Sequence, residues 1–217
     1  FDDCQRMVKQ AFADKTLTQK RMLTSANSIN VARWLPQQFY YFFAYKQWSQ
    51  KDKPPVFSVP SGNFGNICAG LLAHISGLPA AHFIAACNVN DVVPRYLHSG
   101  NYEVKKALPT LSNAMDVGDP SNFVRVLQLF DNNFINLKKM LSGYTVTDAE
   151  TKDTIKRVNQ DTGYLPDPHG AVGYLSLERY LKQHHDQKGI FLETAHPVKF
   201  YDVVELVTGE KVPVPPA

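Results

Sequence analysis

Hydrophobic positions along the chain follow two patterns, one with helical spacing and one of short continuous runs. Apolar residues recur at helical spacing near the start and predict a helix over residues 3–13. A second helix is expected to begin at Ser25 and to continue through the aromatic segment 39–45. Because aromatic side chains fall on every face of that segment, we expect it to be buried or to form a subunit contact.

From residue 53 onward the pattern alternates between strands and helices. Two apolar runs, 56–59 and 82–87, read as buried strands, and a helix over 67–73 joins them. This spacing is typical of a right-handed βαβ crossover, which places both strands parallel in one sheet. Further helices are expected at 92–98, 122–140, 148–160, 171–184 and 203–206, and a further strand at 189–194. The predicted fold class is α/β, a three-layer parallel sheet with flanking helices.

Composition narrows the kind of partner. The chain has 217 residues, is 44% hydrophobic and carries a net charge of only +3, which favours neither a nucleic acid nor a membrane surface. No apolar run approaches the roughly 18 to 20 residues that span a bilayer, and charges interrupt the first residues where a signal peptide would be apolar. The three cysteines form no CxxC pair, so a cytoplasmic protein with a small-molecule partner and no metal is expected.

The loop between the first predicted strand and its helix, PSGNFGN at 60–66, carries the clearest chemistry. Backbone N–H groups at the start of a helix can converge on an anion, and the helix dipole adds to the attraction. Gly62 and Gly65 would allow positive φ angles and a close approach of a phosphate. The loop is neither a Walker A motif nor a GxGxxG fingerprint, so spacing alone leaves a phosphate cradle and an ordinary glycine turn both open.

Several strings resemble segments of the threonine synthase family. They are SANSIN, SVPSGNFGN, ACNVNDVVPRYL, TLSNAMDVGDPSNF, DPHGAVGY and LETAHPVKF, and they occur in the family's order along the whole chain. Members are fold type II pyridoxal 5′-phosphate (PLP) enzymes, related to the β-subunit of tryptophan synthase. The resemblance implies PLP as cofactor and conversion of O-phospho-L-homoserine and water to L-threonine and phosphate.

The resemblance also assigns cofactor contacts. Gly62, Asn63, Phe64 and Asn66 fall on the family's PLP-phosphate loop, and Asn63 is expected also to reach the ring hydroxyl. Asn66 departs from relatives that have Asp there, but a loop acting through its backbone tolerates that change. Thr194 corresponds to the residue facing the pyridine nitrogen, where a neutral hydroxyl moderates the electron sink. From the residues alone, Phe64 could equally be core packing and Thr194 a backbone-bonded strand end.

The resemblance makes one further segment a substrate site. Asn27, Asn30 and Arg33 are spaced by three, which predicts one helical face, and Arg33 would supply a bidentate phosphate contact. A surface helix start rich in asparagine is the alternative, and Asn88, Asn90 and Asp91 present the same choice at another strand end. His169 and His196 could bind an anion or move protons, but structural hydrogen bonding is the favoured interpretation for both.

The Schiff-base lysine is expected upstream of Phe1, because Lys199 belongs to the family's TAHP-containing segment instead. Residues 1–30 are therefore interpreted as a remnant of the small domain with the start of a connecting helix, and 31–217 as the large PLP-binding domain. We expect this chain to be inactive alone, as a truncated fragment. The oligomeric state stays open.

Three other functions compete with threonine synthase. A threonine-synthase-like phospholyase would eliminate phosphate without productive addition of water. A non-catalytic phosphate- or PLP-binding module would need no lysine. A different α/β enzyme could use the glycine loop for another phosphate, although the ordered succession of family strings argues against it.

Overall fold

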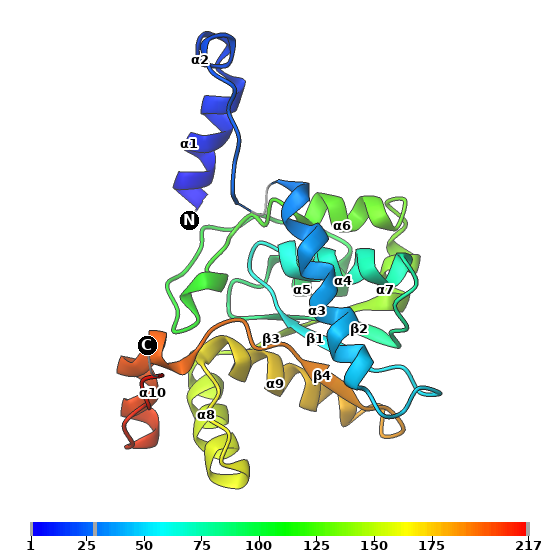
Figure 1. Cartoon of the computed structure of the whole chain (residues 1–217), viewed down its shortest axis with the longest axis vertical. Coiled ribbons are helices and arrows are strands. Elements are labelled where there is room, and N and C mark those ends of the chain that lie inside the picture. Colours follow the sequence, from blue (N-terminus) through cyan, green and yellow to red (C-terminus); the bar gives the residue numbers. More distant parts are fainter. Residues whose placement is uncertain (1, 28–29, 216–217) are drawn as a thin grey trace.

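The computed structural model describes residues 2–27 and 30–215, which surround a four-stranded parallel sheet (Figure 1). The strands are β1 (Val56–Pro60), β2 (His82–Cys87), β3 (Leu141–Thr145) and β4 (Gly189–Phe191), in the order β3-β2-β1-β4. All three neighbouring pairs are parallel, which confirms the predicted sheet. The sequence did not predict β3, and β4 ends three residues before the predicted strand end.

Alternation along β1 gives the sheet a core on each face. Phe57 and Val59 are fully buried in the larger core, whereas Val56 packs in a second cluster on the opposite face. Between them, the Ser58 hydroxyl donates a 2.7 Å hydrogen bond to the carbonyl oxygen of Gly173 on that second side. Strands buried on both faces need helices on both faces, as parallel sheets require.

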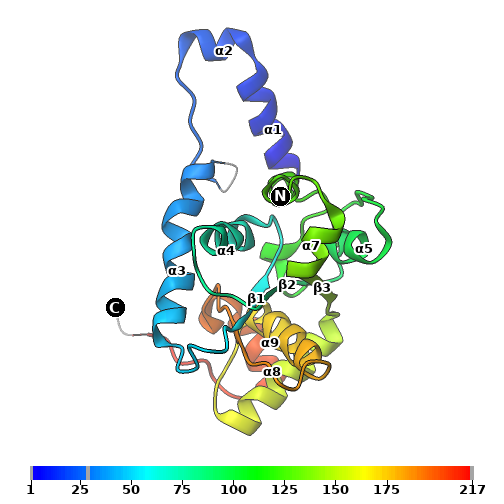
Figure 2. The same cartoon turned by 90° about the vertical axis from the view of Figure 1, so that its right-hand side faces the viewer.

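Helices form the two outer layers (Figures 1 and 2). The larger core receives side chains from α3 (Trp34–Gln47), α4 (Gly65–Ile75), α5 (Val92–Ser99), α6 (Phe123–Leu129) and α7 (Phe134–Met140). The opposite face packs against α9 (Pro168–Leu181), which α8 (Asp148–Thr162) covers, and α10 (Tyr201–Thr208) contacts α8. The predicted three-layer α/β fold is thus confirmed.

The first helices stand apart from these layers. Helices α1 (Asp2–Ala13) and α2 (Lys15–Lys20) project away from the sheet, although the start of α1 lies near the body (Figure 2). The helix over 3–13 is therefore confirmed, and α2 was not foreseen. The division at residues 30 and 31 stays a prediction. No helix in the described part of the chain is long and apolar enough to cross a membrane.

Two predicted helices differ from the observed ones. The helix expected from Ser25 begins only with a 3-10 turn, η1 (Val31–Arg33), because Asn30 caps it by accepting from the Ala32 N–H at 3.1 Å. Residues 28–29 of that prediction lie outside the described residues. The helix expected over 122–140 is split into α6 and α7, because Asp131 and Asn132 adopt left-handed φ angles of 53° and 56°.

The aromatic segment of α3 was expected to be buried or to form a subunit contact, and the structure shows burial on one face only. Tyr41 is fully buried and packs edge-on against Phe57 with ring centroids 5.3 Å apart. By contrast, Phe39, Tyr40 and Phe43 are about 60% exposed. One face of the helix therefore anchors it to α4, and the other remains on the surface.

Candidate functional site

The predicted phosphate loop, residues 60–66, lies where β1 ends and α4 begins. Its first intrahelical hydrogen bond runs from the Cys68 N–H to the Phe64 carbonyl at 3.0 Å, so the N–H groups of residues 65–67 precede the helical ladder. No side chain caps this helix start. The loop therefore offers converging backbone donors and the positive end of a helix dipole at the carboxyl edge of a parallel sheet.

The loop obtains its shape differently from the prediction. Neither Gly62 nor Gly65 has a positive φ; Phe64 takes the left-handed conformation instead, with φ 63°. Gly62 is required for close packing, because an added Cβ would lie 2.7 Å from the Cα of Met115 and 2.9 Å from the carbonyl oxygen of Ala114. Those atoms belong to the 3-10 turn η2 (Asn113–Met115), whose backbone packs directly against Gly62.

The side chains of the loop are largely engaged with the protein. The Phe64 ring is 3% exposed and meets Phe123 edge-on at 5.5 Å, in agreement with the core-packing interpretation. The carboxamide oxygen of Asn63 accepts hydrogen bonds from the backbone N–H and hydroxyl of Ser121, at 2.8 and 2.9 Å. These contacts leave the backbone as the part of the loop that is suited to an anion.

Asn66 is fixed by the adjacent helix. The hydroxyl of Tyr41 lies 2.9 Å from both the carboxamide oxygen and the carbonyl oxygen of Asn66. Burial raises the pKa of the Tyr41 phenol well above its usual value, so the phenol keeps its proton and serves as a donor. The first turn of α4 is thereby held against α3.

A cavity of about 490 Å³ opens beside this turn and collects predicted residues from three parts of the chain. Arg33, Asn66 and Thr194 all line it. The other lining residues are Pro36, Gln37, Tyr40, Leu192 and Glu193. Thr194 is exposed and follows β4, which pairs with β1 in parallel register. The two strand ends thus bring a threonine and the start of α4 to one edge of the sheet, where ligands bind in open α/β folds.

The predicted helical face of Asn27, Asn30 and Arg33 does not exist, because the helix begins later. The Asn30 carboxamide caps η1 and also donates to the Ser25 carbonyl at 3.1 Å. Asn27 lies in a bend, and its backbone N–H donates to the Ser25 hydroxyl at 3.2 Å. Arg33 donates to the Ala26 carbonyl and still reaches the cavity. Of the three, Arg33 is brought together with the cofactor candidates.

The remaining polar candidates have structural partners. His196 caps a short turn by accepting from the Val198 N–H at 3.2 Å, and buried His169 lies 2.6 Å from Asp167, so hydrogen bonding is confirmed for both. Asn88 donates to Thr110 and Asp116 at 2.8 and 2.9 Å. No group of three metal-ligating side chains occurs within residues 2–27 and 30–215.

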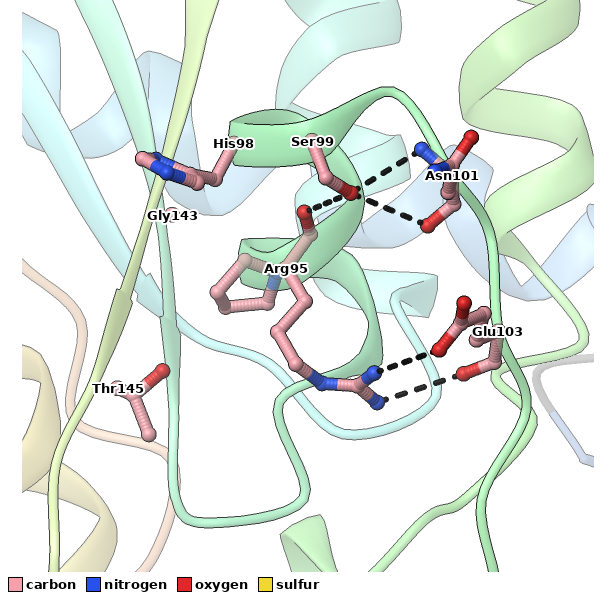
Figure 3. A pocket seen from close by; sticks show the side chains of 8 residues that line it. Arg95, His98, Ser99, Asn101, Glu103, Gly143 and Thr145 are labelled. Carbon is pink, nitrogen blue, oxygen red and sulfur yellow. Dashed lines mark hydrogen bonds and ion pairs between the residues drawn. The ribbon is translucent and has the colours of Figure 1, made fainter.

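A second cavity, of about 450 Å³, lies between α5 and β3 (Figure 3). Its arginine, Arg95, pairs with Asp91 at 2.8 Å and with Glu103 at 3.8 Å, and also donates to the Glu103 carbonyl. Two carboxylates thus compensate the one guanidinium, so this cavity suits an anionic ligand less well than the cavity beside α4.

Sequence reasoning missed part of the site. Tyr40 and Gln37 of α3 line the cavity beside α4, and so does Glu193, the residue before Thr194. The string LETAHPVKF contained Glu193, but the residues alone gave no sign that Glu193 would line this cavity.

The chain matches two known protein families and several curated relatives. Residues 1–192 match the pyridoxal-phosphate dependent enzyme family, and residues 170–217 match the threonine synthase C-terminal family. The chain is 51% identical over 216 residues to the threonine synthase of Haemophilus influenzae and 48% identical to that of Escherichia coli. Each match covers 99% of this chain and 50% of the relative, so the chain spans about half the length of the curated relatives it matches.

Solved structures agree with the sequence matches. The crystal structure of the Escherichia coli threonine synthase is similar with a TM-score of 0.92, at 46% identity over 99% of this chain and 50% of that chain. PLP-bound threonine synthase from Brucella melitensis is similar with a TM-score of 0.87, at 34% identity over 99% of this chain and 51% of that chain. A threonine deaminase from Solanum lycopersicum, only 17% identical, shares the fold with a TM-score of 0.56. The chain therefore belongs to the pyridoxal-phosphate dependent enzyme family.

Proposed function

We propose that this chain is the cofactor-binding half of a threonine synthase, which converts O-phospho-L-homoserine and water to L-threonine and phosphate with PLP. The observation that carries the proposal is the cavity in which Asn66 at the start of α4, Thr194 after β4 and Arg33 come together. The intact enzyme would be a PLP-dependent lyase that breaks a carbon–oxygen bond to phosphate, and a cytoplasmic protein.

The donor set fits PLP. The uncapped start of α4 presents backbone N–H groups with the helix dipole behind them, which suits a phosphate dianion. At the other end, the Thr194 hydroxyl would face the ring nitrogen without forcing it to carry a proton. PLP, when bound, supplies an electron sink for the negative charge that develops on the substrate's α-carbon.

The protein's own residues would bind and orient the substrate. Arg33 offers a planar set of donors for the phosphate or carboxylate of the substrate. The apolar surfaces of Pro36, Tyr40 and Leu192 line the same cavity and would restrict water around the reacting carbons. Asn27 and Asn30 remain proposed substrate contacts, and Gly62, Asn63 and Phe64 remain proposed cofactor contacts through their backbone.

The decisive test is a chimera in which this chain replaces the matching half of the Escherichia coli threonine synthase, to which it is 48% identical over 216 residues. Incubated with PLP and O-phospho-L-homoserine, the chimera should release phosphate and L-threonine in equal amounts. Phosphate with a keto acid and no threonine would instead establish the phospholyase. PLP binding without either product, in a folded chimera, would favour the non-catalytic module.

A matched pair of variants tests the role of Thr194 in the same chimera. Thr194→Ser keeps the hydroxyl and should retain most of the activity, whereas Thr194→Val keeps the shape and removes the hydrogen bond. A lost hydrogen bond of about 1 to 2 kcal/mol corresponds to a loss of about five- to thirtyfold in turnover. Equal activity of the two variants would exclude the proposed contact with the ring nitrogen.

A further inference from the structure

Two acidic residues form a pair: Asp167 at the N-cap of α9 and Glu193, which directly precedes Thr194. Asp167 is fully buried, and its Oδ1 accepts the backbone N–H of His169 at 2.8 Å and lies 2.6 Å from the Nδ1 of the same histidine. The other oxygen, Oδ2, is also buried but has no hydrogen-bond partner among the described residues. Burying a carboxylate oxygen without a hydrogen-bond donor costs free energy, so a donor beside Oδ2 would stabilise the fold.

The neighbouring carboxyl of Glu193 can be that donor. Glu193 as a whole is exposed, but its carboxyl group packs over the Cα of Gly170, where an added Cβ would overlap both oxygens. Tyr164 donates its hydroxyl to Oε1 of Glu193 at 3.1 Å. Only a glycine at position 170 leaves room for the carboxyl group beside Asp167.

The electrostatics favour one proton for the two acids. Burial, and then the adjacent Asp167 carboxyl, raise the pKa of Glu193 well above its usual range. Burial alone would raise the pKa of Asp167 too, but hydrogen bonds from His169 and Glu193 outweigh it and lower that pKa. The proton is therefore held on Glu193, and Asp167 carries the charge.

Three other ionisable groups lie near the pair: Tyr164 bonds Glu193, His169 bonds Asp167, and Arg33 lines the same cavity as Glu193. Burial, and then Glu193 itself, raise the pKa of the Tyr164 phenol to about 12, so it stays a neutral donor. His169 accepts the Ala114 N–H at its Nε2, 3.3 Å away, and so carries its proton on Nδ1, toward Asp167. Arg33 lines the same cavity, and its guanidinium donates to the Ala26 carbonyl.

We propose that Asp167 and Glu193 share one proton and that this pair positions both ends of the cofactor site, a role that rests on the function proposed above. Glu193 precedes Thr194 directly, so the shared proton fixes the backbone that presents the threonine hydroxyl. Through His169, the same pair holds Ala114, which is in close contact with Gly62 of the phosphate loop. Asp167 is fully buried, so it can act on the site only through its neighbours, and the role assigned to Glu193, which lines the cavity beside α4, is to position Thr194.

The shared proton is tested first in this chain without PLP. Carboxyl carbons of aspartate and glutamate are labelled with ¹³C, and the Glu193 signal is assigned by its disappearance in Glu193→Gln. We expect Glu193 to titrate well above the roughly 4.3 of an ordinary glutamate. Asp167→Asn, which preserves the helix cap, should return the midpoint toward that value. A folded wild-type chain with an ordinary Glu193 midpoint would refute the pair, whatever the enzyme's activity.

The positioning role is tested by binding. The dissociation constants of PLP and of inorganic phosphate are measured in the chimera described above, with the wild-type sequence, Glu193→Gln, Glu193→Ala and the surface control Glu210→Gln. A glutamine still donates to Asp167, so Glu193→Gln and the control should bind PLP like wild type. Glu193→Ala should weaken PLP binding by about tenfold, as expected for a lost hydrogen bond to a charge, and weaken phosphate binding less.

The two proposals fail in different ways. Unchanged PLP binding in a folded Glu193→Ala variant would overturn the positioning role while leaving PLP as the cofactor. A wild-type chimera that binds no PLP would overturn the cofactor assignment and, with it, the positioning role. The shared proton would still be decided by the titration.

Discussion

Replacing Gly62 with alanine tests whether the phosphate loop depends on the turn behind it. The new Cβ would lie 2.7 Å from the Cα of Met115 and 2.9 Å from the Ala114 carbonyl oxygen. Carbon atoms in favourable contact are about 3.5 to 4.0 Å apart, so the loop and the turn must separate by about 1 Å. Both contacts are with backbone atoms, so no change of side-chain rotamer can relieve them.

The expected magnitude follows from this overpacking. Inserting a methyl group into a tightly packed site costs about 1–3 kcal/mol, which urea unfolding followed by tryptophan fluorescence can resolve. Because the strain falls on the loop whose N–H groups should bind phosphate, PLP and phosphate affinities should fall together, by about tenfold for each 1.4 kcal/mol.

Gly100→Ala provides a matched control. Gly100 has a φ of 81° with open space around its Cα, so alanine there is strained only by its backbone conformation, at about 1–2 kcal/mol. We expect this control to lose stability and to bind phosphate normally. If Gly62→Ala were as stable as wild type and bound phosphate equally well, the turn at 113–115 would not define the loop.

Three further predictions concern buried groups. Tyr41→Phe removes the donor to Asn66 and should lower the free energy of unfolding by about 1–2 kcal/mol in urea, with an unchanged value contradicting the role of that hydroxyl. Burial raises the pKa of Cys68 to about 12 and that of Cys87 further, so a thiol reagent at pH 8 should modify only exposed Cys4 until the chain is unfolded. Burial lowers the pKa of His82 to about 4, so at this group the folded state binds fewer protons than the unfolded state between about pH 4 and 6.5; the contribution of His82 to stability should therefore fall by about 2–3 kcal/mol as the pH falls through that window, measured as the change in the difference in unfolding free energy between wild type and His82→Gln, and a constant difference would contradict it.

The two strands whose bounds the sequence predicted best are buried on both faces, whereas the half-buried β4 is shorter than the predicted strand. Segments 56–59 and 82–87 are continuous apolar runs, and β1 and β2 are buried at every position. Strand β3 escaped prediction because its sequence, LSGYT, contains a serine and a glycine instead of such a run. Its Gly143 is explained only by the fold, since an added Cβ would lie 2.8 Å from the Cα of Pro94.

Local polar chemistry explains the errors in helix boundaries. Helix α9 begins three residues before the predicted start, because Asp167 caps it and Pro168 fits its first turn. The sequence Asp131-Asn132-Asn133 contained the signal that ends α6 and starts α7, since these residues tolerate left-handed φ and cap helices. A helix prediction based on apolar spacing alone misses both signals.

The candidate site could be predicted as a set of strings but not as an arrangement. The resemblance identified Asn66 and Thr194, which share the cavity beside α4, whereas the spacing of three grouped Asn27 and Asn30 with Arg33 on a helical face that does not form. Pairing of Asp167 with Glu193 depends on how α9 packs beside the segment after β4. Only the folded chain reveals that contact.

The register of the sheet explains how residues so distant in sequence come close enough to bind one ligand, as proposed. Strand β4 lies beside β1, with Gly189 opposite Val56 and Phe191 opposite Ser58, and the Leu192 N–H still donates to the Ser58 carbonyl at 2.9 Å. Neighbouring strands are about 4.8 Å apart, so the chain leaving β4 must emerge next to the loop leaving β1. Because hydrogen bonds between the strands fix this spacing, the separation between the phosphate loop and Thr194 is a property of the sheet. The proposed Asp167–Glu193 pair would then only need to orient the residues that follow β4, and one shared proton is sufficient for that.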